Sequence, residues 1–196
     1  MVYIITIIGA MVAVALSNFL YDGVFTFLAF GEMLLWSFLG VVAVIAIDGI
    51  LAFVIRRMPE RWFAPGKRFF AVPEWERRLY RKLKINKWKK YVPELGCFTG
   101  FHKDKLQNTG DSAYLGRFLL ESNYGSLGHI AGAVFGFLIM LLPFLRPLSM
   151  GLPIAIVNFV LSMLPTCILR ANTPALTRLW QKAKVRGEGT GPKQKE

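Results

Sequence analysis

The chain has 196 residues, of which 54% are hydrophobic and 14% aromatic. That apolar content is typical of membrane proteins and disfavours a soluble domain of this size. The 24 Lys and Arg outnumber the 12 Asp and Glu, and the resulting net charge of +12 indicates cytoplasmic loops and anionic lipid headgroups rather than nucleic acid.

Two apolar segments open the chain. Residues 3–20 extend about 27 Å as a helix, enough to cross the hydrocarbon core of a bilayer. A cleaved signal peptide is disfavoured, because no basic residue precedes the run and no small-residue cleavage pattern follows it. After a connection over 21–32, a second span is predicted over 33–55, which Arg56 and Arg57 end.

Asp48 lies within the second predicted span. A carboxylate is costly at that depth, so we expect its side chain to face the protein interior and to have a partner. Two interpretations stay open, a structural hydrogen bond to a neighbouring helix and a functional group.

The polar middle of the chain predicts helices on the membrane surface. Residues 58–73 are irregular and mix aromatic with basic side chains, which suits the headgroup layer. Trp75, Leu79 and Leu83 then recur every four residues among Arg and Lys, which predicts an amphipathic helix from Glu74. A second short basic segment follows, and we expect both to lie on the bilayer.

Two more apolar spans come later in the chain. After a polar loop over 96–110, Asp111 or Ser112 is expected to cap a helix. The third span is predicted over 127–145 and the fourth over 148–169. Three glycines at intervals of four residues begin the third span and predict the close approach of a partner helix; they are Gly128, Gly132 and Gly136.

Charge predicts the topology. Residues 56–128 hold 16 Lys and Arg against 7 Asp and Glu, and residues 170–196 hold 7 against 2. The positive-inside rule places both regions, and both termini, in the cytoplasm. We therefore predict one all-α integral membrane domain over 1–196, multi-pass in the cell membrane. It has four transmembrane helices, a cytoplasmic basic amphipathic-helical insertion over 56–126 between the second and third, and a basic disordered tail over 182–196.

Common catalytic and metal-binding motifs are missing from the sequence. It has no phosphate-binding glycine loop, HExxH, CxxC or GxSxG pattern, and its two cysteines, Cys97 and Cys167, lie far apart. We predict no metal, no tightly bound cofactor and no nucleic-acid partner.

Glu121 and His129 are the remaining candidates for catalysis. His129 stands at the predicted cytoplasmic mouth of the third span, and a histidine paired with a carboxylate can act as a general base. On an unbroken helix the two residues lie about 80° apart around the axis, whereas a bend at Gly125 would change that geometry. Alternatively, His129 packs among the glycines and hydrogen-bonds a carbonyl.

Several motifs carry a family resemblance. They are WERRLY at 75–80, INKWKKYVPELG at 85–96, YLGRFLLESN at 114–123, the downstream His129, and an N-x-P-x-L pattern from Asn172. Together they resemble the glycosyl-4,4'-diaponeurosporenoate acyltransferases of staphyloxanthin-type pathways, over roughly residues 75–180. Those enzymes are small integral membrane proteins that esterify a sugar hydroxyl of a carotenoid glycoside with a fatty acyl chain.

The resemblance implies acyl transfer at the cytoplasmic interface, with His129 as general base and Glu121 orienting it. It also implies membrane lipids and a lipidic acceptor as partners and an acyl-CoA or acyl-carrier-protein thioester as donor. This chain has Tyr124 and Ser126 where the family pattern Glu-x-x-Arg-x-Glu-x-x-His has Arg and the second Glu. The other expected substrate contacts are Lys89, Lys90 and Arg117 for the donor head, Asn123, Tyr124 and Asn172 for the acceptor, and Trp88.

Two other functions stay open. The chain could be a non-enzymatic helical-bundle subunit that docks on a lipid-modifying or transport complex through its glycine-rich third span. The residues at 124 and 126 favour that interpretation, because they depart from the family pattern. A lipid-head methyltransferase is the third interpretation, although no adenosyl-donor motif supports it.

Overall fold

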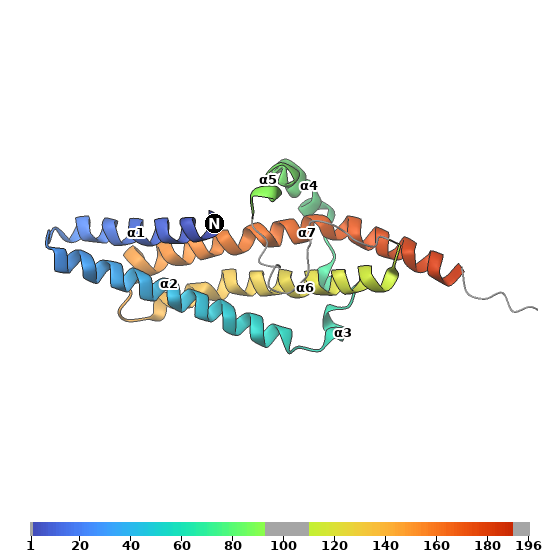
Figure 1. Cartoon of the computed structure of the whole chain (residues 1–196), viewed down its shortest axis with the longest axis horizontal. Helices are drawn as coiled ribbons and strands as arrows, with labels where there is room; N and C mark the ends of the chain where they lie inside the picture. The colour runs from blue at the N-terminus through green and yellow to red at the C-terminus, as the bar shows by residue number, and fades with distance from the viewer. Residues whose placement is uncertain (1, 93–109, 190–196) are drawn as a thin grey trace, which may run out of the picture. The chain divides into compact units, whose positions relative to one another are not determined.

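The computed structural model describes residues 2–92 and 110–189, and the regular structure in these ranges is helical (Figure 1). The chain divides into two compact units. We call residues 1–57 with 127–166 the apolar unit, and residues 58–126 with 167–196 the basic unit.

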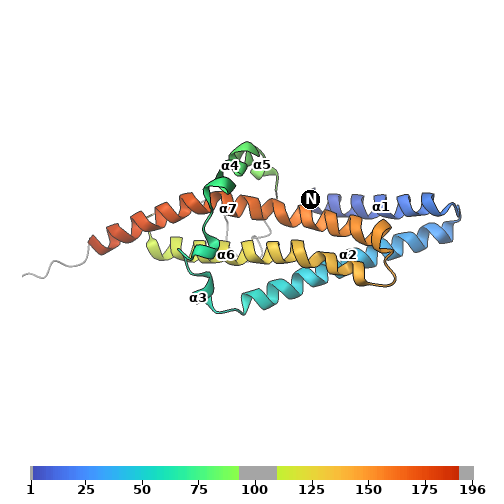
Figure 2. The ribbon, with the colours of Figure 1, turned by 180° about the vertical axis from the view of Figure 1, so that it is seen from behind.

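In the apolar unit, α1 (Val2–Asp22) and α2 (Phe27–Arg56) form an antiparallel helical hairpin, visible in both Figure 1 and Figure 2. The connection between them is shorter than predicted. The Thr26 side chain accepts a hydrogen bond from the Ala29 N–H at 3.1 Å and so caps α2, which begins six residues before Met33. Glu32 consequently lies on the helix, where its carboxylate accepts a hydrogen bond from the Trp36 indole at 3.2 Å.

The other two long helices differ from the predicted spans, since the third ends before residue 145 and the fourth continues well past residue 169. They are α6 (Ser112–Phe135), which continues as the 3₁₀ segment η4 (Gly136–Leu141), and α7 (Leu152–Gly189), which follows the π-helical segment η5 (Pro147–Gly151). Asp111 caps α6, because its carboxylate accepts from the Ala113 and Tyr114 N–H groups at 2.8 and 3.3 Å. The helix continues through Gly125 without a break.

Four helices of the described chain are long and apolar enough to cross a membrane. They cover Tyr3–Asp22, Phe27–Arg56, Ser112–Leu141 and Leu148–Arg186. This confirms the predicted number of apolar spans, although the boundaries differ. The prediction of a disordered tail from Lys182 is wrong as far as Gly189, because α7 is helical to that residue. Residues 190–196 lie outside the described part of the chain.

Polar contacts join the ends of the helices in the apolar unit. The Arg146 guanidinium forms an ion pair with the Asp22 carboxylate at 2.5 Å, and the Asn18 amide donates to the Ser149 carbonyl at 2.8 Å. The core beneath them is aliphatic, whereas many outward-facing residues of α1 and α2, such as Ile5 and Phe53, are more than half exposed. Such an apolar outer surface suits contact with lipid.

Short helices make up the first part of the basic unit. They are α3 (Glu60–Phe63), η1 (Arg68–Phe70), α4 (Glu74–Lys82), α5 (Ile85–Trp88) and η2 (Lys89–Tyr91). The predicted amphipathic helix is α4, and it lies beside α7 in both views (Figures 1 and 2). The predicted polar loop falls on residues outside the described part of the chain, apart from Gly110.

Candidate functional site

The glycine-rich face of α6 packs against polar side chains of its own unit. A Cβ atom built on Gly132 would lie 2.6 Å from Asp48 Oδ1, and one built on Gly136 would lie 2.5 Å from Asn158 Nδ2. The Asn158 amide donates to the Gly132 carbonyl at 3.2 Å and lies beside the Asp48 carboxylate, whose buried Oδ1 has no hydrogen-bond partner in the described part of the chain. These glycines therefore make room for polar side chains of the chain's own α2 and α7.

This packing predicts different costs for glycine substitutions along one helix face. We expect Gly132→Ala to lower the free energy of unfolding by about 1–3 kcal/mol, because the added methyl group displaces Asp48 from Asn158. Shortening the facing side chain with Asp48→Ala should remove most of that extra cost, because the methyl group then has space. The measurement is a double-mutant cycle of unfolding free energies in detergent.

Gly128→Ala is the matched control, since a Cβ atom there would meet nothing within 4 Å. We expect this variant to be as stable as the wild type, or more stable by up to about 1 kcal/mol from helix propensity. Equal stabilities for Gly128→Ala and Gly132→Ala would contradict the packing described here.

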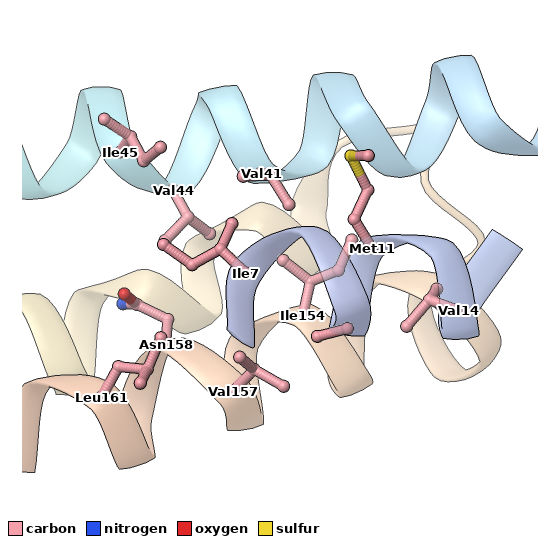
Figure 3. A pocket seen from close by; sticks show the side chains of 11 residues that line it. Ile7, Met11, Val14, Val41, Val44, Ile45, Ile154, Val157, Asn158 and Leu161 are labelled. Atoms are coloured by element: carbon pink, nitrogen blue, oxygen red, sulfur yellow. The ribbon is translucent and has the colours of Figure 1, made fainter. Parts of the chain in front are cut away.

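The apolar unit holds a small pocket of about 50 Å³, partly open to the surroundings (Figure 3). It is lined by α1, α2 and α7, through residues such as Met11, Val44 and Ile154. Asn158 is the only polar side chain in the lining, and this same residue donates to Gly132 on α6. The cavity thus offers an apolar surface with one hydrogen-bonding group.

His129 lies on α6 one helical turn before Gly132 and is half-buried. It is the only histidine in the described part of the chain. Both residues belong to the apolar unit, so His129 is placed one turn from the backbone that Asn158 and Asp48 contact. A neutral imidazole at this position can accept a proton from a hydroxyl group.

Glu121 belongs to the basic unit, where its carboxylate forms an ion pair with Arg117 one turn earlier on α6, at 2.9 Å. Arg117 also binds Glu60 of α3 at 2.8 Å. The Glu121 side chain is only 12% exposed, whereas those of Arg117 and Glu60 are 57% and 65% exposed. The arginine expected to bind the donor head therefore already holds two carboxylates.

Asn123 and Tyr124, the expected acceptor contacts, are buried and bonded to the segment around α3. The Asn123 amide donates to the Phe63 carbonyl, and the Tyr124 hydroxyl donates to the Met58 carbonyl, both at 2.8 Å. The Tyr124 ring stacks on Phe63 with ring centroids 3.8 Å apart. Ser126, at the other divergent position, is also buried. These side chains hold α3 against α6.

The remaining expected contacts lie on separate elements of the basic unit. Lys89 and Lys90 are exposed on η2, whereas Trp88 packs against the core under α4 and donates its indole N–H to the Leu83 carbonyl at 3.0 Å. Asn172 is half-buried on α7. Lys89 and Lys90 are thus accessible from solution, with the Lys90 ammonium 4.9 Å from the centre of the Tyr91 ring, whereas Trp88 contributes to the packing of the unit.

The most buried charged group of the basic unit was not among the predicted site residues. Glu76 on α4 is 6% exposed and accepts two hydrogen bonds from the Arg170 guanidinium on α7, the Nη2 bond measuring 2.7 Å. Arg170 also donates to the Ala71 carbonyl at 3.3 Å, and the Tyr80 hydroxyl donates to Glu76.

Hydrogen bonds and burial set the protonation states of Glu76 and Tyr80. Burial by itself would raise the pKa of Glu76, but the hydrogen bonds from Arg170 and Tyr80 outweigh burial and lower it. Burial, together with the neighbouring Glu76 carboxylate, raises the pKa of Tyr80. Glu76 is therefore an anion and Tyr80 a neutral donor at neutral pH. The sequence does carry a signal for this cluster. Glu76 and Tyr80 lie four residues apart, one helical turn, and each directly follows an apolar residue of α4, Trp75 or Leu79.

Comparison with known proteins places the chain in a family. The model of the glycosyl-4,4'-diaponeurosporenoate acyltransferase family matches residues 59–182, more than half of the chain. The chain belongs to this family. No curated protein and no solved structure matches it closely enough to be compared. Membership in this acyltransferase family supports acyl-transfer activity in general.

The family match begins just before α3 and ends within α7. It includes the whole of α6, with Glu121 and His129, and both partners of the Glu76–Arg170 pair. The α1–α2 hairpin lies before the match. The part of the chain that matches the acyltransferase family therefore holds the polar groups described above, apart from Asp48.

Proposed function

We propose that the protein is a membrane acyltransferase that esterifies a hydroxyl of a glycolipid or carotenoid glycoside with a fatty acyl chain at the cytoplasmic face of the cell membrane. The family match over 59–182 carries this proposal. The four apolar helices support it further, because both the acyl chain and such an acceptor reside in a bilayer.

The apolar cavity supports the same function. Its aliphatic lining suits a short segment of an acyl or polyene chain, and Asn158 in that lining contacts α6 one turn from His129. A chain that occupies the cavity can therefore place its functional end near the imidazole.

In the proposed reaction, His129 removes the proton from the acceptor hydroxyl as the hydroxyl oxygen attacks the carbonyl carbon of an acyl thioester. The new ester C–O bond forms and the C–S bond breaks. The protonated imidazole then returns its proton to the departing thiolate, so the base is regenerated. In this scheme Glu121 is a positioning residue for His129, and its own carboxylate is held by the ion pair with Arg117.

The donor head is anionic in both expected donors, acyl-CoA and acyl-carrier protein. Lys89 and Lys90 are exposed on η2 and can form charge-assisted hydrogen bonds to phosphate groups. Asn172, half-buried on α7, would contact an acceptor hydroxyl. With the basic regions in the cytoplasm, the donor binds from that side.

The test is transfer of a radiolabelled acyl chain to extracted glycolipid in membrane vesicles of both orientations. Acyl-CoA and acyl-carrier protein cannot cross the bilayer, so inside-out vesicles should form labelled ester and right-side-out vesicles should not. Permeabilising the right-side-out vesicles should restore the activity. Labelled ester only in intact right-side-out vesicles would place the site on the other face, and no ester from either donor under any condition would contradict acyl transfer.

A further inference from the structure

The apolar stripe of α4 is exposed and does not pack into the basic unit. Trp75 is 68% exposed, Leu79 43% and Leu83 47%, and they recur every four residues along one side of the helix. Glu76 and Tyr80, each one position later, are buried instead. One position rotates a side chain by about 100°, so the stripe and the buried face are separate sides of the helix.

The buried face fixes α4 to a defined level of α7. Glu76 binds Arg170, and Tyr80 packs with Ile168 in one apolar cluster of the basic unit. Arg170 is the first charged residue of α7, after an uncharged run of 18 residues from Leu152 to Leu169. That run extends about 27 Å, the thickness of a hydrocarbon core, so α4 is attached where the apolar part of α7 ends.

Basic side chains border the stripe. Arg78 and Lys82 precede Leu79 and Leu83 by one position each, and the Arg78 side chain is 71% exposed. Residues 74–90 hold eight Lys and Arg against two Glu. One of these carboxylates, Glu76, is buried, and the other, Glu74, lies within 4 Å of Arg77, Arg78 and Arg81. An exposed apolar stripe with a basic border matches an anionic lipid surface.

We propose that α4 is a membrane-surface helix whose Trp75–Leu79–Leu83 stripe lies in the headgroup layer of the bilayer that α7 crosses, with Arg78 and Lys82 binding anionic phospholipid. Attachment at the end of the apolar run favours lipid over a protein partner. The surface is separate from the groups proposed for acyl transfer, and its test does not depend on activity.

The test uses spin labels on the full-length protein in vesicles of phosphatidylglycerol and phosphatidylcholine. In a background with Cys97→Ala and Cys167→Ala, single cysteines replace Leu79 or Leu83, and Arg81→Cys is the control. Arg81 is also exposed, at 69% of its side chain, but it lies about 200° from Leu79 around the helix. Collision of each label with apolar oxygen and with a water-soluble nickel chelate is measured by electron paramagnetic resonance.

We expect the oxygen-to-nickel collision ratio to be several-fold higher at positions 79 and 83 than at 81. Vesicles of phosphatidylcholine alone should lower the ratio at 79, and so should Arg78→Gln with Lys82→Gln in the anionic vesicles. Equal collision ratios at 79, 83 and 81 would overturn the proposal. A ratio at 79 that changes neither with lipid charge nor with the Arg78→Gln and Lys82→Gln substitutions would show that α4 does not bind anionic phospholipid through these two residues. Labels that face water until acyl-carrier protein is added would assign the stripe to that protein instead.

Discussion

Replacing His129 with alanine is expected to lower acyl-transfer turnover by about 10²–10⁴-fold, the usual contribution of a positioned general base. The residue is half-buried on α6, one turn before the glycine that Asn158 and Asp48 contact. Removing an imidazole leaves the apolar cores of both units unchanged, so the variant should still insert and fold. The measurement is labelled ester formed per mole of purified, reconstituted protein.

Two variants make this result specific. His102→Ala removes the other histidine of the chain and should leave turnover near that of the wild type. Glu121→Gln should reduce turnover less than His129→Ala, because it removes the charge that binds Arg117 without touching the base. Near-full transfer by His129→Ala would exclude it as the base, and a loss confined to His102→Ala would move that role to the other histidine.

Breaking the Glu76–Arg170 pair is expected to cause the largest loss of stability in the basic unit. Arg170→Leu should lower the free energy of unfolding by about 3–5 kcal/mol, because the buried Glu76 carboxylate then lacks its charge partner. The side chains of Arg170 and Glu76 are only 16% and 8% exposed. Denaturant titration of the protein in detergent, followed by tryptophan fluorescence, measures the change.

Matched variants separate burial from charge. The double variant Glu76→Leu with Arg170→Met should be much closer to the wild type, because it leaves no unpaired charge. Breaking the exposed Arg117–Glu60 pair with Glu60→Gln should cost less than about 1 kcal/mol, since water solvates both groups. An equal loss for Arg170→Leu and Glu60→Gln would contradict the burial of the first pair.

The same pair predicts a pH dependence of stability. The pKa of Glu76 is lowered in the folded protein, so its contribution is complete above the unfolded pKa, about 4.3, and is lost as pH falls through the lower folded pKa. The stability advantage of the wild type over Arg170→Leu should therefore persist at neutral pH and shrink in the acidic range below that value. A difference in stability between the wild type and Arg170→Leu that grows as the pH falls would contradict this prediction.

Much of the architecture follows from residue patterns alone. Long uncharged runs predict helices that cross a bilayer, and four such helices are present in the described chain. Their ends were less predictable, because a local contact sets each of them. Thr26 caps α2 ahead of the predicted start. Charged residues after Leu169 end the predicted membrane span, but α7 continues through them as a helix.

The pairing of polar groups depends on contacts between distant parts of the chain. The sequence singles out Asp48 as a carboxylate in need of a partner, and the fold places it beside Asn158 and against Gly132 of α6. The prediction that Glu121 orients His129 stays a prediction, and the fold adds an ion pair between the Glu121 carboxylate and Arg117, one turn earlier on α6. No spacing rule predicts that Asn123 and Tyr124 bond carbonyls of the α3 segment about 60 residues earlier.

The sequence by itself determined that the chain is apolar, helical and basic in its middle and end, because hydrophobicity and helical periodicity are properties of neighbouring residues. It also showed the family motifs that the match over 59–182 confirms. Only the tertiary structure decided which face of α4 is buried, because Glu76 is stabilised inside the protein by Arg170, 94 residues away. That long-range ion pair turns the Glu76–Tyr80 face of α4 inward and leaves its apolar stripe exposed.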